Sequence, residues 1–169
     1  MQQVTASIDI DAPASLVWAI LTDFASYKRW NPFIRAVLGR PSNGNALRVT
    51  LQRQGRDAVS ASSTLTYLRE PRELRWRRRH LAPGLYSSEH RFRIEALPAG
   101  GVRFHQTVQI EGFFAALIGR GDQRATQEGF HAMNHALKQR AERMQARSAE
   151  PAGETTYSYG TTVPPMPVN

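Results

Sequence analysis

From residue 34 to about residue 111, apolar and polar side chains alternate in short runs. Turn residues interrupt this alternation at 41–44, 54–57, 69–71, 82–84 and 98–101. Because the side chains of a strand point alternately to the two faces of a sheet, the pattern predicts six strands separated by turns. One face of the sheet is predicted to be apolar and the other polar, which is typical of an antiparallel sheet that is buried on one side.

The expected inner face is built mainly from large apolar residues. They are Leu47, Val49, Leu51, Ala61, Leu65, Tyr67, Leu74, Trp76, Phe92, Ile94, Val102, Phe104, Val108 and Ile110. The expected outer face is rich in arginine, and glutamates such as Glu73, Glu89 and Glu95 stand among the arginines. The net charge of +8 favours acidic partners, but this mixture of charges is typical of a solvated sheet face.

Helices are predicted on both sides of this region. Residues 4–10 read as a first strand. A helix with one apolar stripe is predicted to open within 12–15 and to end at Thr22 or Asp23, and a second short helix to run up to Trp30, where Asn31 and Pro32 end it. We expect Asn31 to bond the neighbouring backbone. A long helix is predicted from Asp122 to about residue 146, with an apolar face that includes Thr126, Phe130, Met133, Leu137, Ala141 and Met144. The domain is expected to span 1–147, and 148–169 to form a disordered tail.

Several local motifs resemble the START/polyketide cyclase-like (SRPBCC) superfamily over about residues 3–146. They are Ile10-Asp11-Ala12-Pro13, Leu21-Thr22-Asp23-Phe24, Tyr27-Lys28-Arg29-Trp30-Asn31-Pro32-Phe33, Glu73-Leu74-Arg75-Trp76 and Glu111-Gly112-Phe113-Phe114. The resemblance implies an α+β helix-grip fold, in which a curved antiparallel sheet of about seven strands wraps around a long C-terminal helix. It also implies functions that range from lipid carriage to polyketide cyclisation, so the fold by itself does not select one.

A curved sheet touches a single helix along a line, so the space beside that line must be filled by side chains or by a ligand. The small inward residues Ala61, Ser63 and Ser88 leave room, and we therefore expect a cavity that binds a small apolar or amphipathic molecule. The candidate cavity residues are Phe33, Leu65, Trp76, Arg78, Tyr86, Ser88, His90, Phe92, Phe104, Gln106, Phe130, Met133, Asn134 and Leu137.

Arg78 and His90 are the candidate polar anchors of this cavity, because a charge-assisted hydrogen bond from such donors orients a carboxylate, phenol or carbonyl. The alternative interpretation is that Arg78 reaches solvent and that His90 bonds Tyr86 or a backbone group. Both interpretations depend on the register of residues 75–80, because a slip by one residue would exchange the two faces.

Three function classes remain open at this point. Binding or transport of a hydrophobic molecule is favoured. An enzyme is the first alternative, because some members of the resembled family are polyketide cyclases or aromatases that would use the polar cavity residues. The second is an interaction module that uses the arginines of the outer face. That face lacks aromatic residues for stacking, so we expect no specific nucleic-acid binding.

No cofactor or metal site is expected. The chain has no cysteine, and His131 and His135 stand four residues apart without further ligands. The beginning of the chain has no basic or apolar leader, and its longest apolar run is too short for a membrane span, so we expect a soluble, cytoplasmic protein. Within the glycine-bracketed segment 112–119, the apolar Phe113, Phe114 and Leu117 are predicted to form a lid, to touch a membrane surface or to pack on the first helices.

Overall fold

The computed structural model describes residues 1–53, 55–79, 87–112 and 120–149. In chain order, the elements are β1 (Gln2–Ile10), α1 (Ala14–Thr22), the 3-10 helix η1 (Phe24–Ser26), α2 (Tyr27–Trp30), β2 (Ile34–Leu38), β3 (Ala46–Leu51), β4 (Val59–Arg69), β5 (Glu73–Arg79), β6 (Ser87–Ala96), β7 (Val102–Glu111) and α3 (Arg120–Ala149). This order confirms the predicted sequence of one strand, short helices, six strands and a long helix.

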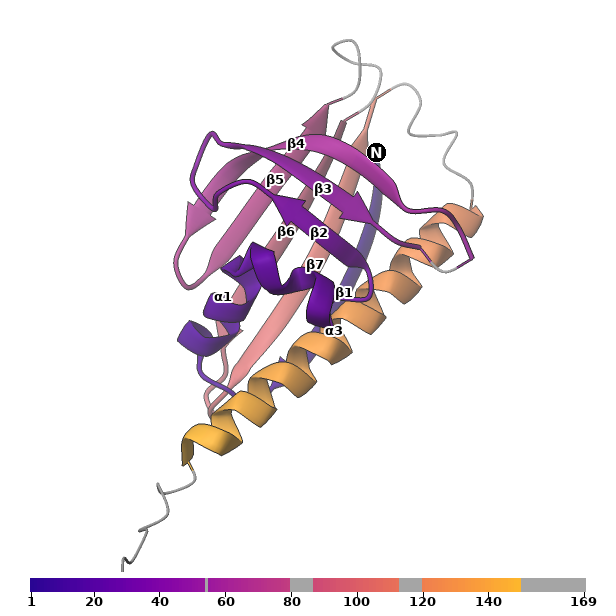
Figure 1. Ribbon diagram of the computed structural model, residues 1–169. Coiled ribbons are helices and arrows are strands. Elements are labelled where there is room, and N and C mark those ends of the chain that lie inside the picture. The colour runs from indigo at the N-terminus through magenta and orange to yellow at the C-terminus, as the bar shows by residue number, and fades with distance from the viewer. Residues whose placement is uncertain (54, 80–86, 113–119, 150–169) are drawn as a thin grey trace, which may run out of the picture.

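The seven strands form one antiparallel sheet with the order β1-β7-β6-β5-β4-β3-β2. The sheet curls around α3, which crosses its concave side, while α1, η1 and α2 lie beside α3 and β2 (Figure 1). The predicted α+β helix-grip fold is therefore the observed one. The hydrophobic core lies between the inner face of the sheet, α3 and the short helices.

The predicted register is confirmed for the middle of the sheet. Trp76 of β5 pairs with His90 of β6, and Leu74 pairs with Phe92, so these apolar side chains share the inner face. Leu74 and Phe92 are fully buried, and Trp76 is almost so. Because the side-chain period of a strand is two, the arginines between them point to the outer face.

The prediction that Tyr67 points inward is wrong. The pairing of β4 with β5 shifts between Leu65, which pairs with Trp76, and Tyr67, which pairs with Arg75. This irregularity adds one residue to β4 and reverses the facing of the residues beyond it. The Tyr67 ring therefore lies on the outer face under the guanidinium of Arg75, 4.8 Å from the ring centroid, and Leu68 packs against the core in its place.

The long helix α3 is slightly longer than predicted and ends at Ala149. Its predicted apolar face is confirmed for the fully buried side chains of Phe130, Met133, Leu137 and Ala141. The prediction is wrong for Met144, which is 39% exposed, since the end of α3 extends past the sheet (Figure 1). The predicted tail lies outside the described residues from residue 150 onward.

Asn31 ends α2 and fixes the start of β2. Its side-chain Oδ1 accepts hydrogen bonds from the backbone N–H groups of Phe33, at 3.0 Å, and Ile34, at 2.8 Å. Asn31 is fully buried, so these bonds have no competition from solvent. The predicted backbone-bonding role of Asn31 is confirmed, and the contact holds Phe33 in its position on the inner side.

We expect Asn31→Ala to lower the free energy of unfolding by about 2 kcal/mol, because two buried N–H groups would lose their acceptor. Urea unfolding followed by circular dichroism measures this change. Asn43→Ala, in the exposed turn between β2 and β3, is the matched control and should change the free energy of unfolding by less than about 0.5 kcal/mol. Equal effects of the two substitutions would contradict the proposed role of the Asn31 side chain.

Candidate functional site

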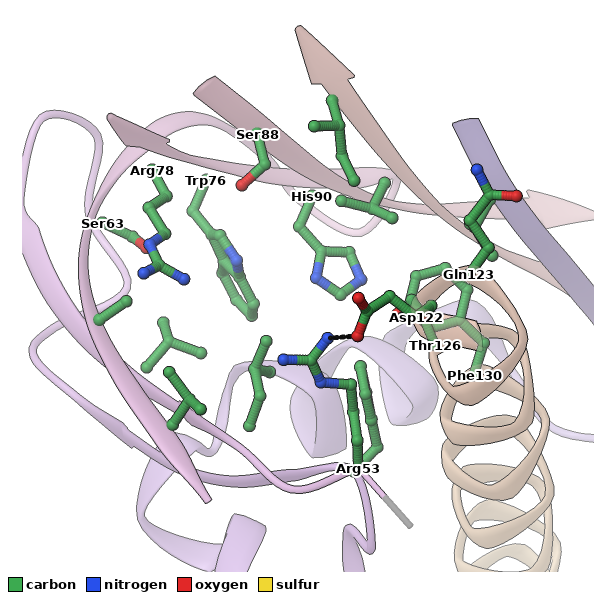
Figure 2. A pocket seen from close by; sticks show the side chains of 18 of the residues that line it. Arg53, Ser63, Trp76, Arg78, Ser88, His90, Asp122, Gln123, Thr126 and Phe130 are labelled. Atoms are coloured by element: carbon green, nitrogen blue, oxygen red, sulfur yellow. Dashed lines mark hydrogen bonds and ion pairs between the residues drawn. The ribbon is translucent and has the colours of Figure 1, made fainter. Parts of the chain in front are cut away.

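A cavity of about 450 Å³ lies between the inner face of the sheet and the first turns of α3 (Figure 2). The residues that line it are Val4, Phe33, Val49, Leu51, Arg53, Arg56, Val59, Ala61, Ser63, Trp76, Arg78, Ser88, His90, Val108, Ile110, Asp122, Gln123, Thr126 and Phe130. This wall is mixed, with ten apolar and nine polar or charged residues, so the cavity offers both an apolar surface and polar groups that can orient a small molecule.

Small side chains explain why a cavity remains at this place. Ala61 and Ser63 of β4, Ser88 of β6 and Thr126 of α3 all stand on its wall, where larger residues would fill the space. Farther along α3, the same layer is closed by fully buried side chains such as Met133. The cavity is therefore one end of the space between sheet and helix, and the hydrophobic core occupies the other end.

His90 is the polar group most deeply placed in the wall. Its imidazole stacks on Phe92 and Phe130, with ring centroids 4.4 and 5.1 Å away, and meets the edge of Trp76 at 5.5 Å. Burial lowers the pKa of His90 to about 3, so the ring is neutral near pH 7. The ring points into the cavity beside Trp76 (Figure 2). Its neutral state suits an apolar site that must avoid an unpaired buried charge.

Gln106 of β7 is the observed hydrogen-bond partner of His90. The two Nε2 atoms are 3.0 Å apart, and Gln106 Nε2 also lies 3.3 Å from the sulfur of Met133. Because an amide nitrogen only donates, His90 Nε2 accepts and the ring proton is assigned to Nδ1. In the described part of the chain, Gln106 Oε1 and both amide atoms of Asn134 are buried without a protein partner.

The end of the cavity next to α3 is charged. Arg53 and Arg56, from the turn between β3 and β4, both reach Asp122 in the first turn of α3. Their Nη1 atoms lie 3.1 and 2.8 Å from the same carboxylate oxygen, Oδ1. The contact joins the turn to the helix and places two guanidinium groups at the cavity wall. Figure 2 shows Arg53 and Asp122 pointing toward each other there.

The structure divides the predicted cavity residues into two groups. Phe33, Trp76, Arg78, Ser88, His90 and Phe130 line the cavity. Leu65, Phe92, Phe104, Gln106, Met133, Asn134 and Leu137 are buried in the adjoining core and do not form its wall. Tyr86 and the predicted lid residues Phe113, Phe114 and Leu117 lie outside the described residues. That the lining residues bind a ligand stays a prediction.

Sequence reasoning missed Arg53, Arg56 and Asp122. The two arginines stand in a segment that reads as a turn, and Asp122 reads as the start of a helix. Their contact joins residues 69 positions apart, as Arg53 and Asp122 show. No local pattern in the sequence predicts this contact. The one available signal was that residues of opposite charge stand in the turn and at the start of the helix.

The outer face of the sheet carries a lattice of ion pairs. Glu73 forms ion pairs with both Arg75 and Arg91, and its Oε1 lies 2.6 Å from Arg91 Nε. Glu89 Oε2 lies 3.1 Å from Arg77 Nη2. At the other edge, the hydrogen bond from Arg103 keeps the pKa of Asp9 below its usual value. These contacts fit the predicted solvated face, and they leave the charges of that face largely compensated.

No three histidine, aspartate or glutamate side chains in residues 1–53, 55–79, 87–112 and 120–149 lie close enough together to hold a metal ion. Over the same ranges, no helix combines the length and the apolar character that crossing a membrane requires.

Comparisons with known proteins agree on the fold. A family model described as "Polyketide cyclase / dehydrase and lipid transport" matches residues 1–167. A START superfamily protein from Mycobacterium smegmatis is 22% identical, with a TM-score of 0.66, over 84% of this chain and 98% of that one. The ZhuI aromatase/cyclase from Streptomyces sp. R1128 is 19% identical, with a TM-score of 0.62, over 88% and 98% of the two chains. No curated protein matches the sequence.

Proposed function

The chain belongs to the polyketide cyclase/dehydrase and lipid transport family, and from this membership we propose that its cavity binds a small hydrophobic or amphipathic molecule. The cavity itself carries the proposal: about 450 Å³ of space lies against a wall that is apolar in part, with Trp76, Val108 and Ile110, and polar in part. Its volume is within the usual range of small-molecule sites, roughly 300 to 1,000 Å³. Transfer of an apolar molecule from water to the apolar part of this wall lowers its free energy, and the polar groups would orient it.

The wall suits binding better than acid–base catalysis. A general base works best when its pKa is near the operating pH. Burial lowers the pKa of His90 to about 3, and its Nε2 already bonds Gln106. Asp122, the only carboxylate among the lining residues that the structure describes, is ion-paired with two arginines. We therefore place binding or transport ahead of polyketide cyclase-like chemistry as the function of this site.

A pair of neighbouring serines tests the proposal. Ser63 is buried on the cavity wall, whereas Ser62 points to the exposed outer face of the same strand. We expect Ser63→Phe to fill part of the cavity and to weaken binding of the neutral fluorescent probe N-phenyl-1-naphthylamine by about tenfold or more, which is about 1.4 kcal/mol. Ser62→Phe adds the same ring outside the cavity and should bind the probe as the unchanged protein does.

Probe fluorescence titrations measure these affinities, and circular dichroism checks that each variant is folded. Failure of the unchanged protein to bind the probe, or equal binding by the two phenylalanine variants, would contradict a cavity site. Native mass spectrometry of protein purified from its own host adds an independent readout, since a stoichiometric small-molecule passenger is the expected result.

A further inference from the structure

The charges at one end of the cavity narrow the class of ligand. We propose that the ligand is an amphipathic acid, with an apolar body in the cavity and a carboxylate bound by Arg53 and Arg56. This inference rests on the proposed binding function and adds the chemistry of the headgroup. Its starting point is that two guanidinium groups at the cavity wall share a single carboxylate, that of Asp122.

The geometry leaves most of the guanidinium donors available. A guanidinium carries five N–H donors, and it can bind a carboxylate through two of them at once. The contacts of Arg53 and Arg56 with Asp122 are made through Nη1, and both reach the same oxygen, Oδ1. Within the described residues, the side chains of these two arginines make no other hydrogen bond or ion pair. A second carboxylate would therefore meet free donors at this place.

The electrostatics favour an anion in the same way. Arg53, Arg56 and Asp122 together carry a net charge of +1, and the N-terminal end of α3 adds partial positive charge. The side chains of Arg53 and Asp122 are 28% and 29% exposed, and that of Arg56 is 49% exposed. Solvent consequently screens the site in part, but the low-dielectric protein on its inner side strengthens the attraction.

The outer face of the sheet gives the contrast that makes this cluster unusual. On that polar face, Arg75, Arg77 and Arg91 share Glu73 and Glu89, which also leaves a net charge of +1, so the contrast lies in the surface beside the charges. Beside the cavity cluster, the wall is apolar, with Leu51, Val59, Val108 and Ile110. A positively charged cluster next to apolar residues matches a molecule with a negatively charged end and a hydrophobic body.

The experiment compares three ligands that share a ten-carbon tail: decanoate, 1-decanol and decyltrimethylammonium. Isothermal titration at low ionic strength and pH 8 is expected to give decanoate an affinity about tenfold or more above that of 1-decanol, with the cation weakest. Added salt should reduce this preference, because the arginines are partly exposed. Arg53→Gln combined with Arg56→Gln should bring the ratio of decanoate to decanol affinity close to one.

Two further variants separate this effect from a loss of folding. Asp122→Asn removes the competing internal carboxylate, so it should raise the affinity for decanoate, a gain that an unfolded protein cannot show. Arg91→Gln removes an arginine from the outer face and should leave the ratio unchanged.

Equal binding of decanoate and 1-decanol, or a preference that survives the double substitution, would overturn the acid headgroup while leaving the proposed cavity function in place. Binding of none of the three ligands would overturn both.

Discussion

Replacing Gly129 by leucine is expected to lower the free energy of unfolding by about 3 kcal/mol, the upper part of the usual range for overpacking a core. Gly129 lies on α3 against the ring of Phe33, and a Cβ atom added there would stand 2.2 Å from Phe33 Cδ2. To make room, the buried ring would have to leave its edge-on contact with Phe130 at 5.5 Å and shift toward the cavity that it lines. The close approach of helix and ring therefore requires glycine.

A smaller substitution at residue 129 and a control substitution elsewhere on α3 test whether this loss of stability comes from the contact with Phe33. Gly129→Ala should still destabilise the protein, although alanine by itself favours a helix over glycine by about 1 kcal/mol. Gly121→Ala on the same helix is the control, since its Cβ would meet only Arg56 Nη2 at 3.9 Å, an ordinary contact. Urea unfolding gives the free energies. If Gly129→Ala destabilises the protein as expected, Phe33→Leu in that background should recover part of the lost free energy of unfolding. A stabilised Gly129→Ala protein would instead show that the Phe33 ring moves aside and would contradict the prediction.

The stability of the protein should fall by about 2 kcal/mol between pH 7 and pH 5 because of His90. Burial lowers the pKa of His90 from 6.5 to about 3 in the folded protein. Between these two values the unfolded chain binds a proton at this position and the folded protein does not. Protonation therefore favours unfolding as the pH falls below 6.5, by about 1.4 kcal/mol for each pH unit.

Urea unfolding curves at pH 7, 6 and 5 measure this dependence, and His90→Phe provides the comparison. The variant has no titrating group at residue 90, so its free energy of unfolding should change much less over the same range. The lower limit of pH 5 matters because hydrogen bonds from arginine or lysine hold the pKa values of Asp9 and Glu142 below their usual values. Those carboxylates lose stabilisation only at more acidic pH. Parallel curves for the two proteins would contradict a buried, neutral His90.

Much of the fold could be predicted from sequence because its signals are local and repeated. The alternation through Leu74, Trp76 and Arg78 continues without a break, so the register of β5 followed from counting. Tyr67 shows where counting fails, since one extra residue in β4 reverses the faces beyond it. Met144 shows a second failure, because periodicity indicates a face of a helix without indicating where the covering sheet ends.

The candidate site could be predicted only in part, for a related reason. Inward-facing residues such as Trp76 and Phe92 have the same pattern in the sequence, yet the first lines the cavity and the second is packed in the core. The difference depends on how far each lies along α3 and on which small side chains stand opposite. Likewise, sequence reasoning named Tyr86 or the backbone as a partner for His90, whereas the structure gives Gln106 on the neighbouring strand.

The sequence by itself therefore determined the order of the elements, the apolar and polar faces of most strands, and the buried face of α3 up to Ala141. These features arise from periodicities of two and about 3.6 residues, which hydrophobic burial imposes locally. Only the tertiary structure decided which part of the inner face stays unfilled and that Arg53 and Arg56 meet Asp122 there. Both depend on the curvature of the sheet around the helix, which brings together residues that no local pattern connects.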